Sequence, residues 1–297
     1  MIGELAALGA ALCWTFSAVF YKRALASIHP IQANTVRCVG TSLVLLAFLA
    51  VLGKVNVFTE LPKQAIGLAC ISGIVGLGLG DTLYMLSLKT IGVSRAVPIT
   101  CTYPLFNLLW AYLLAGENIT LPMAAGAFII VFGVWLLTGE KVDKNLKKPA
   151  EDGIRGTIFA LCTAMAWSIS ISMVNLAVKK TQNIEHAYAV NTIRLLAVAV
   201  LLLAYTLASI RDTGFTKVGW RNAAFLLGGG LIAIGLGWFF LTFSFLLIPE
   251  SQAVPISSTT PLFSTMAGVV MLREKVTAKT VLGSVLVVVG IFIVFAV

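Results

Sequence analysis

Long apolar stretches alternate with short clusters of charged residues along the whole chain. Each stretch is about 20 residues long, which is enough to cross a bilayer as a helix. The stretches are continuous rather than alternating, which favours helices over a β-barrel. The pattern predicts ten membrane-spanning helices, at residues 3–22, 32–53, 65–88, 94–115, 120–138, 154–176, 188–209, 221–247, 252–272 and 278–297.

The composition agrees with this pattern. Of the 297 residues, 59% are hydrophobic and only 11% are charged, whereas about 25% of a typical soluble domain is charged. The predicted fold class is therefore an all-α polytopic membrane protein of the cell membrane. The first residues carry Glu4 and no basic segment, so we expect the first stretch to remain as a span rather than to act as a cleaved signal.

Charge and cysteine content argue against several other classes. The net charge of +9 is spread over many loops, whereas a nucleic-acid-binding protein concentrates it on one face. We interpret it as an orientation signal and as contact with membrane lipid, and we expect no nucleic acid partner. The five cysteines form no CxxC pair, so we predict no disulfide framework, no zinc site and no cofactor.

The second half of the chain repeats the first at a shift of 157 residues. The segment NTVR at 34–37 aligns with NTIR at 191–194, and AVPITCTYPLF at 96–106 aligns with AVPISSTTPLF at 253–263. About 20 of the 65 positions between 73 and 137 match their counterparts without a gap. An internal duplication on this scale predicts two structurally equivalent halves.

Each half holds five predicted spans, and an odd number turns the second half upside down relative to the first. We predict two inverted five-helix repeats, at residues 1–139 and 154–297, joined by a polar linker at 140–153. Inverted halves suit alternating access because they can exchange roles when the protein changes its facing. Glycines at matching positions in spans three and eight are expected to let helices pack closely.

Prolines interrupt spans four and nine at matching positions, Pro104 and Pro261. Matched interruptions in two halves indicate a binding site near the membrane midplane, so both are candidates for helix breaks and gating. The alternative is that neighbouring helices satisfy the freed carbonyl groups. Pro98 and Pro255 lie near predicted helix starts, where proline costs little.

These features together resemble a known family. The chain has five spans in each half, a tryptophan within spans one and six, and an arginine near the start of spans two and seven. It also has two Pro-Leu-Phe runs, each followed further along by a Glu and, three residues later, a Thr. This combination resembles the drug/metabolite transporter superfamily, and most closely its EamA-type branch. The resemblance implies a secondary transporter with a central cavity lined by spans 1, 3, 4, 6, 8 and 9. It implies export or exchange of small metabolites, often amino acids or amphipathic compounds. Spans eight to ten contain no lysine well inside the membrane, which argues against organic phosphates.

Asp81 is the one acidic residue predicted to lie well inside a span. Intramembrane charges mark function by default, so Asp81 is a candidate for proton coupling or for binding a substrate ammonium group. The alternative is a structural partner for a cation such as Arg37. Tyr84 follows at i+3 on the same helical face.

The remaining candidates surround the predicted centre. Arg37 and Arg194 occupy matching positions and are expected to hold a helix end or a gate rather than the substrate. Aromatic and hydroxyl side chains are expected to line a cavity for amphipathic ligands, and these residues are Trp14, Tyr84, Tyr103, Trp167, Trp238 and Thr260. Glu117 and Glu274 are expected to hold a loop or a helix start.

Other interpretations remain open at this stage. The same fold can serve an uncoupled facilitator or exchanger, whereas a membrane enzyme would need a reactive grouping around His29 or His186 that the sequence does not supply. A monomer is expected to suffice, and a homodimer is left open. Positive residues are more frequent in the loops opposite the termini, which favours termini outside the cytoplasm; the family resemblance favours termini inside.

Overall fold

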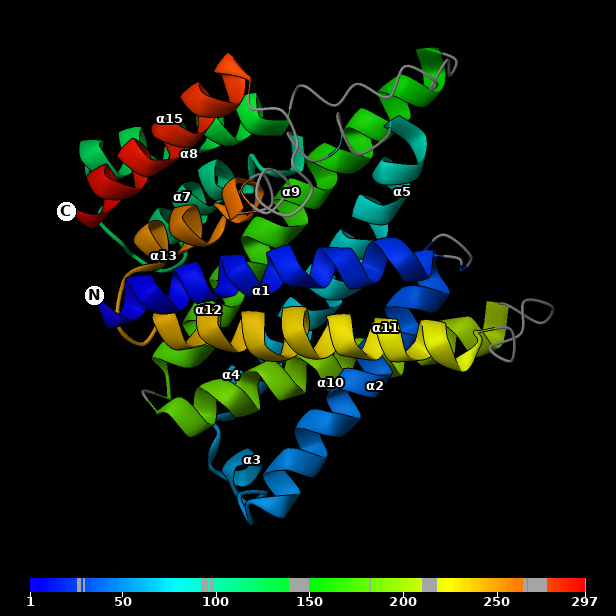
Figure 1. The fold of residues 1–297 in the computed structure, drawn as a ribbon. Coiled ribbons are helices and arrows are strands. Elements are labelled where there is room, and N and C mark those ends of the chain that lie inside the picture. Colours follow the sequence, from blue (N-terminus) through cyan, green and yellow to red (C-terminus); the bar gives the residue numbers. More distant parts are fainter. Residues whose placement is uncertain are drawn as a thin grey trace.

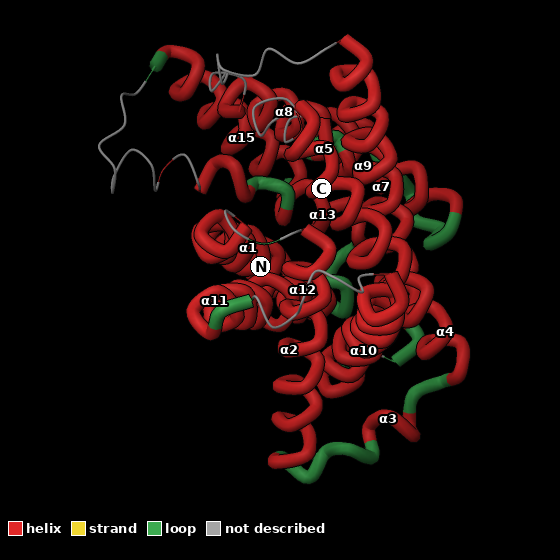
Figure 2. Tube along the Cα trace, turned by 90° about the vertical axis from the view of Figure 1, so that its right-hand side faces the viewer, coloured by secondary structure: helices red, strands yellow, loops and turns green. Residues whose placement is uncertain are grey.

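The structure is a computed structural model, and it describes residues 1–25, 28, 30–91, 96, 99–138, 150–181, 183–209, 218–263, 266 and 277–296. Every regular element in these residues is a helix (Figure 2). The N-terminus and the C-terminus lie at the same end of the bundle (Figure 1), as an even number of spans requires.

The first half contributes five spans. Span three is continuous through three elements, and a short helix, α3 (Val57–Glu60), precedes it. The spans are α1 (Ile2–Leu25), α2 (Pro30–Val51), α4–η1–α5 (Lys63–Ser72, Gly73–Gly80 and Asp81–Ile91), a broken span that ends in α7 (Tyr103–Leu113), and α8 (Leu121–Thr138).

The second half repeats this order. Its five spans are α9 (Ala150–Lys179), α10 (Ile184–Ser209), α11–η3–α12 (Trp220–Gly230, Leu231–Gly237 and Trp238–Ser244), a broken span that begins with α13 (Glu250–Ser257), and α15 (Ala278–Phe295). The structure confirms the predicted fold class of ten helical spans in two inverted repeats. The first span is longer than predicted and ends at Leu25, and the ninth begins two residues early, at Glu250.

Spans three and eight each contain a π-helical segment at the position of the repeated glycines. The segments, η1 and η3, end at matching positions under the shift of 157 residues, Gly80 and Gly237, and their starts differ by one residue. A π-helix has a wider turn than an α-helix and leaves its carbonyl groups less regularly bonded, and such segments concentrate at functional sites. The two halves therefore share a local distortion that neither hydropathy nor proline content predicts.

The two halves interlock through these spans. Span three packs on α9 and α10 of the second half, and span eight packs on α1 and α2 of the first; Figure 1 shows α1 lying along α11 and α12. A Cβ atom added at Gly80 would lie 2.8 Å from Cδ1 of Trp167, and one at Gly237 would lie 2.8 Å from Nε1 of Trp14. The close approach of backbone to indole brings the two candidate tryptophans to the boundary between the halves.

The prolines mark breaks in spans four and nine. The helix is interrupted at residues 101–102 and 258–259, and Pro104 and Pro261 are each the second residue of the helical segment that follows. Equivalent backbone turns close the two breaks, with Thr102 N donating to Ile99 O at 3.1 Å and Thr259 N donating to Ile256 O at 3.3 Å. Pro255 lies inside α13, and Pro98 lies outside the described residues.

Candidate functional site

An ion pair joins spans two and three in the middle of the bundle. Asp81 is the first residue of α5, and its Oδ2 accepts a hydrogen bond from Nη2 of Arg37 in α2. The Asp81 and Arg37 residues are only 9% and 5% exposed. Trp167 Nε1 in α9 donates to the other carboxylate oxygen, Oδ1, at 2.9 Å. Both oxygens are thus bonded, one from each half of the protein.

The Arg37 side chain is held by its own half. Its Nε donates to Oδ1 of Asn34 at 2.9 Å, and Asn34 Nδ2 donates to the carbonyl oxygen of Leu77 in η1 at 2.9 Å. The guanidinium carbon lies 5.1 Å from the centroid of the Tyr21 ring, within reach of a cation–π interaction. The π-helical segment therefore positions the arginine through a carbonyl group.

Aromatic side chains close around the Asp81 carboxylate. The Trp167 ring lies 5.1 Å from Tyr84 of α5 and 6.0 Å, edge to face, from Tyr103 of α7. Offset and edge-to-face pairs at these distances are favourable. The structure thus brings four predicted cavity residues and one predicted gating residue into one group, the Asp81 cluster: Asp81, Arg37, Trp167, Tyr84 and Tyr103.

The second half builds a counterpart with different chemistry. Arg194 is the repeat equivalent of Arg37, and its guanidinium carbon lies 3.8 Å from the ring centroid of Trp238, which replaces Asp81. Asn191 Nδ2 donates to Ile234 O in η3 at 2.9 Å, matching the contact of Asn34 with Leu77. The second arginine therefore faces an indole where the first faces a carboxylate.

One serine hydroxyl from each half holds Arg194 further. Its Nε donates to Oγ of Ser72 at 3.0 Å and its Nη2 donates to Oγ of Ser170 at 3.3 Å, while Nη1 has no hydrogen-bond partner. A buried cationic donor without a partner is costly, so Nη1 of Arg194 is an unsatisfied polar group of this site.

Trp14 joins this second group. The Trp14 and Trp238 rings meet edge to face at 5.9 Å, and Trp14 Nε1 donates to Ala233 O in η3 at 3.1 Å. We name Arg194, Trp238 and Trp14 the Trp238 cluster. The predicted cavity residue Thr260 instead binds span one, where its Oγ1 donates to Ala11 O at 3.3 Å.

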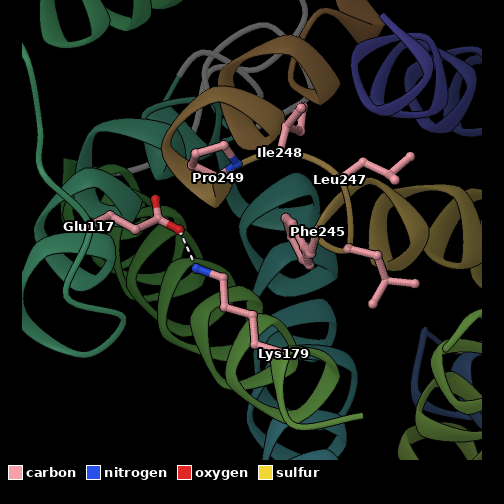
Figure 3. A pocket seen from close by; sticks show the side chains of 7 residues that line it. Glu117, Lys179, Phe245, Leu247, Ile248 and Pro249 are labelled. Atoms are coloured by element: carbon pink, nitrogen blue, oxygen red, sulfur yellow. Dashed lines mark hydrogen bonds and ion pairs between the residues drawn. The ribbon is translucent and has the colours of Figure 1, made fainter. Parts of the chain in front are cut away.

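A separate pocket lies at the end of the bundle that holds the termini. Its volume is about 510 Å³, and Glu117, Lys179 and residues 245–249 line it (Figure 3). None of the predicted substrate-binding residues lines this pocket. It lies near the start of α1, where Gly3 packs against Leu247 and Ile248.

Glu117 holds the start of α13 at this pocket. Its carboxylate oxygens accept from the backbone N–H groups of Glu250 and Ser251, both at 3.0 Å, and from Nζ of Lys179 at 2.7 Å. Burial works to raise the pKa of the Glu117 carboxyl, but the ammonium and the two N–H groups outweigh it and hold that pKa below its usual range. Glu117 thus fixes a helix start, as the sequence predicts; Glu274 lies outside the described residues.

Sequence reasoning missed several polar side chains of the interior. Asn34 and Asn191 belong to the repeated NTVR and NTIR segments, so the repeat itself was a usable signal. Glu250 is fully buried although it precedes the predicted span. Trp110 of α7 donates to Ser168 Oγ at 2.9 Å. Within the described residues, no group of three His, Cys, Asp or Glu side chains could hold a metal ion.

Ten helical spans in two interlocked, inverted halves, with charged and aromatic side chains gathered where the halves meet, define a polytopic membrane protein of the transporter class. Comparison with known proteins gives the family: the chain belongs to the EamA-like transporter family, whose profile matches residues 1–139 and 154–296.

Individual relatives agree with this assignment. A protein of Archaeoglobus fulgidus named as an uncharacterized transporter is 24% identical over 295 residues, which cover 99% of this chain and 98% of that protein. A second uncharacterized transporter, from Clostridium kluyveri, is 22% identical over 78% of this chain and 72% of its own length. A solved crystal structure shares the fold with a TM-score of 0.79 at 18% identity, over 98% of this chain and 95% of the other.

Proposed function

We propose that the protein is a secondary transporter that moves small amphipathic metabolites, amino acids among them, by alternating access around the Asp81 and Trp238 clusters. The observation that carries the proposal is the buried Arg37–Asp81 pair, which lies beside Trp167, Tyr84 and Tyr103 at the boundary between the halves. Charges at this depth are expensive and are kept for function. The family resemblance favours export as the direction.

The pair suits a zwitterionic ligand. An ammonium group can take the place of Arg37 at the Asp81 carboxylate, a carboxylate can take the place of Asp81 at Arg37, and the aromatic rings can cover the apolar part. The ion pair thus keeps each of the two binding groups from being buried without a partner. Breaks before Pro104 and Pro261 supply the hinges that let one side close while the other opens.

Tryptophan fluorescence tests the site. The purified protein is titrated with amino acids, amines and nucleotide-sugar analogues, and we expect a saturable change for one chemical class that Trp167→Phe abolishes. Trp135→Phe is the matched control because its ring is 53% exposed on the outer surface of α8. A saturable response that survives in Trp167→Phe would place the ligand elsewhere.

Asp81 is the proposed coupling group of a proton-driven cycle. Its carboxylate is bound to the Arg37 guanidinium by opposite charge, so a change at Asp81 would act directly on the link between spans two and three. We expect Asp81→Asn to abolish flux driven by a pH gradient while the protein stays folded, because Arg37 keeps Asn34 and the Tyr21 ring as partners. Flux in proteoliposomes and thermal unfolding check both parts; undiminished driven flux contradicts the assignment.

An uncoupled facilitator or exchanger is the second candidate. The observation in its favour is that Asp81 is already neutralised by Arg37 and has no acidic counterpart in the second half, where Trp238 stands. Counterflow without any gradient, together with the absence of gradient-driven accumulation in the wild type, would decide for this mechanism.

A further inference from the structure

Glu250 lies at the start of α13 in the interior of the bundle, and its residue is 0% exposed. Its Oε1 accepts from Oγ of Ser172 at 2.9 Å, while Oε2 has no hydrogen-bond partner. A buried carboxylate oxygen without a partner is costly. The sequence gives no hint of this burial, because the residue precedes its apolar stretch.

The side chains around Glu250 are polar and also buried. Asn175 interacts with the Glu250 carboxyl, yet neither of its amide atoms has a hydrogen bond, and the residue is 0% exposed. Asn107 Nδ2 donates to Ser172 Oγ at 3.0 Å and leaves its own Oδ1 unpartnered. Two amide oxygens and one carboxylate oxygen thus lack a donor, and the one unpartnered donor beside them is Nδ2 of Asn175. One amide group cannot serve all three acceptors, so an added proton would supply a further donor.

The same side chains form a polar stripe along α9. Ser168, Ser172, Asn175 and Lys179 recur at helical spacing, and Ser168 is next in sequence to Trp167 of the Asp81 cluster. Ser172 lies seven residues before Lys179, or about 10 Å along the axis at about 1.5 Å per residue. Lys179 and Pro249 line the pocket of Figure 3, and Ser172 bonds to Glu250 deeper along α9. The Glu250 side chain therefore lies between that pocket and the centre of the protein.

The charged groups near Glu250 come from few elements. Glu117 accepts from its backbone N–H, and Lys179 of α9 pairs with Glu117. Elements α7, α8 and α12 carry no charged residue, Lys279 of α15 is exposed, and Glu4 of α1 pairs with the terminal ammonium at 2.6 Å. Within the described residues, Glu117 is thus the nearest like charge and opposes a second negative charge at Glu250.

We propose that Glu250 is a proton-binding site distinct from Asp81, lined by Ser172, Asn175 and Asn107 and reached through the Glu117–Lys179 pocket. The inference deepens, and rests on, the proposed transport function. A hydronium ion in the pocket gives its proton to Oε2, a new O–H bond forms, and water is left behind. The new hydroxyl donates to Oδ1 of Asn175. Release of the proton to water reverses the step and restores the negative charge of Glu250 beside Glu117. The protonation state of Glu250 therefore acts on the start of span nine, which Glu117 caps.

Carbodiimide labelling tests the site without any transported substrate. Dicyclohexylcarbodiimide reacts with protonated carboxyl groups in apolar surroundings, and mass spectrometry locates the adduct in the full-length protein in lipid nanodiscs. We expect labelling at Glu250 that falls about tenfold per pH unit above the midpoint, as one titrating proton requires. Labelling should vanish at this position in Glu250→Gln. Absent or pH-independent labelling of the folded wild type overturns the proposal, and this arm needs no variant.

Transport in proteoliposomes separates this inference from the proposed function. We expect Glu250→Gln to lose pH-gradient-driven flux of the class found by the fluorescence titration and to keep counterflow. Glu185→Gln is the matched control, since that carboxylate is half exposed and pairs with Lys54 at the surface. Driven flux that persists in a folded Glu250→Gln protein overturns the inference alone. A wild type without flux or counterflow of any compound, but with pH-dependent labelling, overturns the transport function and leaves the proton site standing.

Discussion

Arg37→Ala is expected to lower the free energy of unfolding by about 3–5 kcal/mol, because it leaves the buried Asp81 carboxylate without a countercharge. The Trp167 indole remains as a donor but carries no charge. Thermal and denaturant unfolding in detergent, followed by tryptophan fluorescence, measures the change. Transport should be lost together with stability, since the same pair is proposed to receive the ligand.

Two further variants make this prediction specific. Lys54→Ala breaks the surface pair with Glu185, whose side chains are 52% and 45% exposed, and is expected to cost no more than about 1 kcal/mol. The double variant Arg37→Gln, Asp81→Asn removes both buried charges and should regain most of the stability lost by Arg37→Ala. A loss in Arg37→Ala no larger than that in Lys54→Ala would show that the pair does not stabilise the bundle.

Gly73→Ala is expected to lower the free energy of unfolding by about 1–3 kcal/mol through overpacking, and also to slow transport. A Cβ atom at this position would overlap the backbone carbonyl oxygen of Arg194 and lie 3.0 Å from its Cα atom. Backbone atoms cannot rotate away as a side chain can, so α10 must move relative to span three. That movement displaces Arg194 from Ser72 and Trp238.

Gly67→Ala is the matched control on the same span. A Cβ atom there meets nothing within 4 Å, so the substitution should stabilise the helix by up to about 1 kcal/mol through the higher helix propensity of alanine. Unfolding midpoints and initial rates of counterflow are measured for both variants. Equal unfolding midpoints for Gly73→Ala and Gly67→Ala would mean that η1 and α10 can move apart where they cross without loss of stability.

Much of the fold can be predicted from the sequence because apolar length and proline act on their own segment of the chain. Apolar length predicts each span, and the shift of 157 residues pairs Arg37 with Arg194 and Pro104 with Pro261 before any coordinates are known. The helix interruptions before the two prolines follow from the missing N–H group of proline, which acts on its own turn.

The contacts of the site could not be predicted in the same way. Asp81 meets Trp167 across 86 positions of the chain, and such a pairing depends on how the halves interlock. The π-helical segments depend on tertiary contacts at their glycines rather than on local propensity. The burial of Glu250 was not predicted, because hydropathy assigns a charged residue beside an apolar stretch to water. In the structure, the Glu117 carboxylate accepts from the backbone N–H of Glu250 at the start of α13, and Glu250 is buried.

The replacement of Asp81 by Trp238 in the second half has a thermodynamic consequence. In a perfectly symmetric pair of halves, the inward-facing and outward-facing forms would have equal energy, and an empty carrier would divide its time evenly. Here one arginine faces a carboxylate and the other an indole ring, so exchanging the roles of the halves does not regenerate the same contacts. A difference of about 1.4 kcal/mol between the forms would already give one of them a tenfold excess. In the proposed alternating-access cycle, the protein without ligand should therefore favour one of its two facings, and preferential binding of the ligand to the other form should shift that balance.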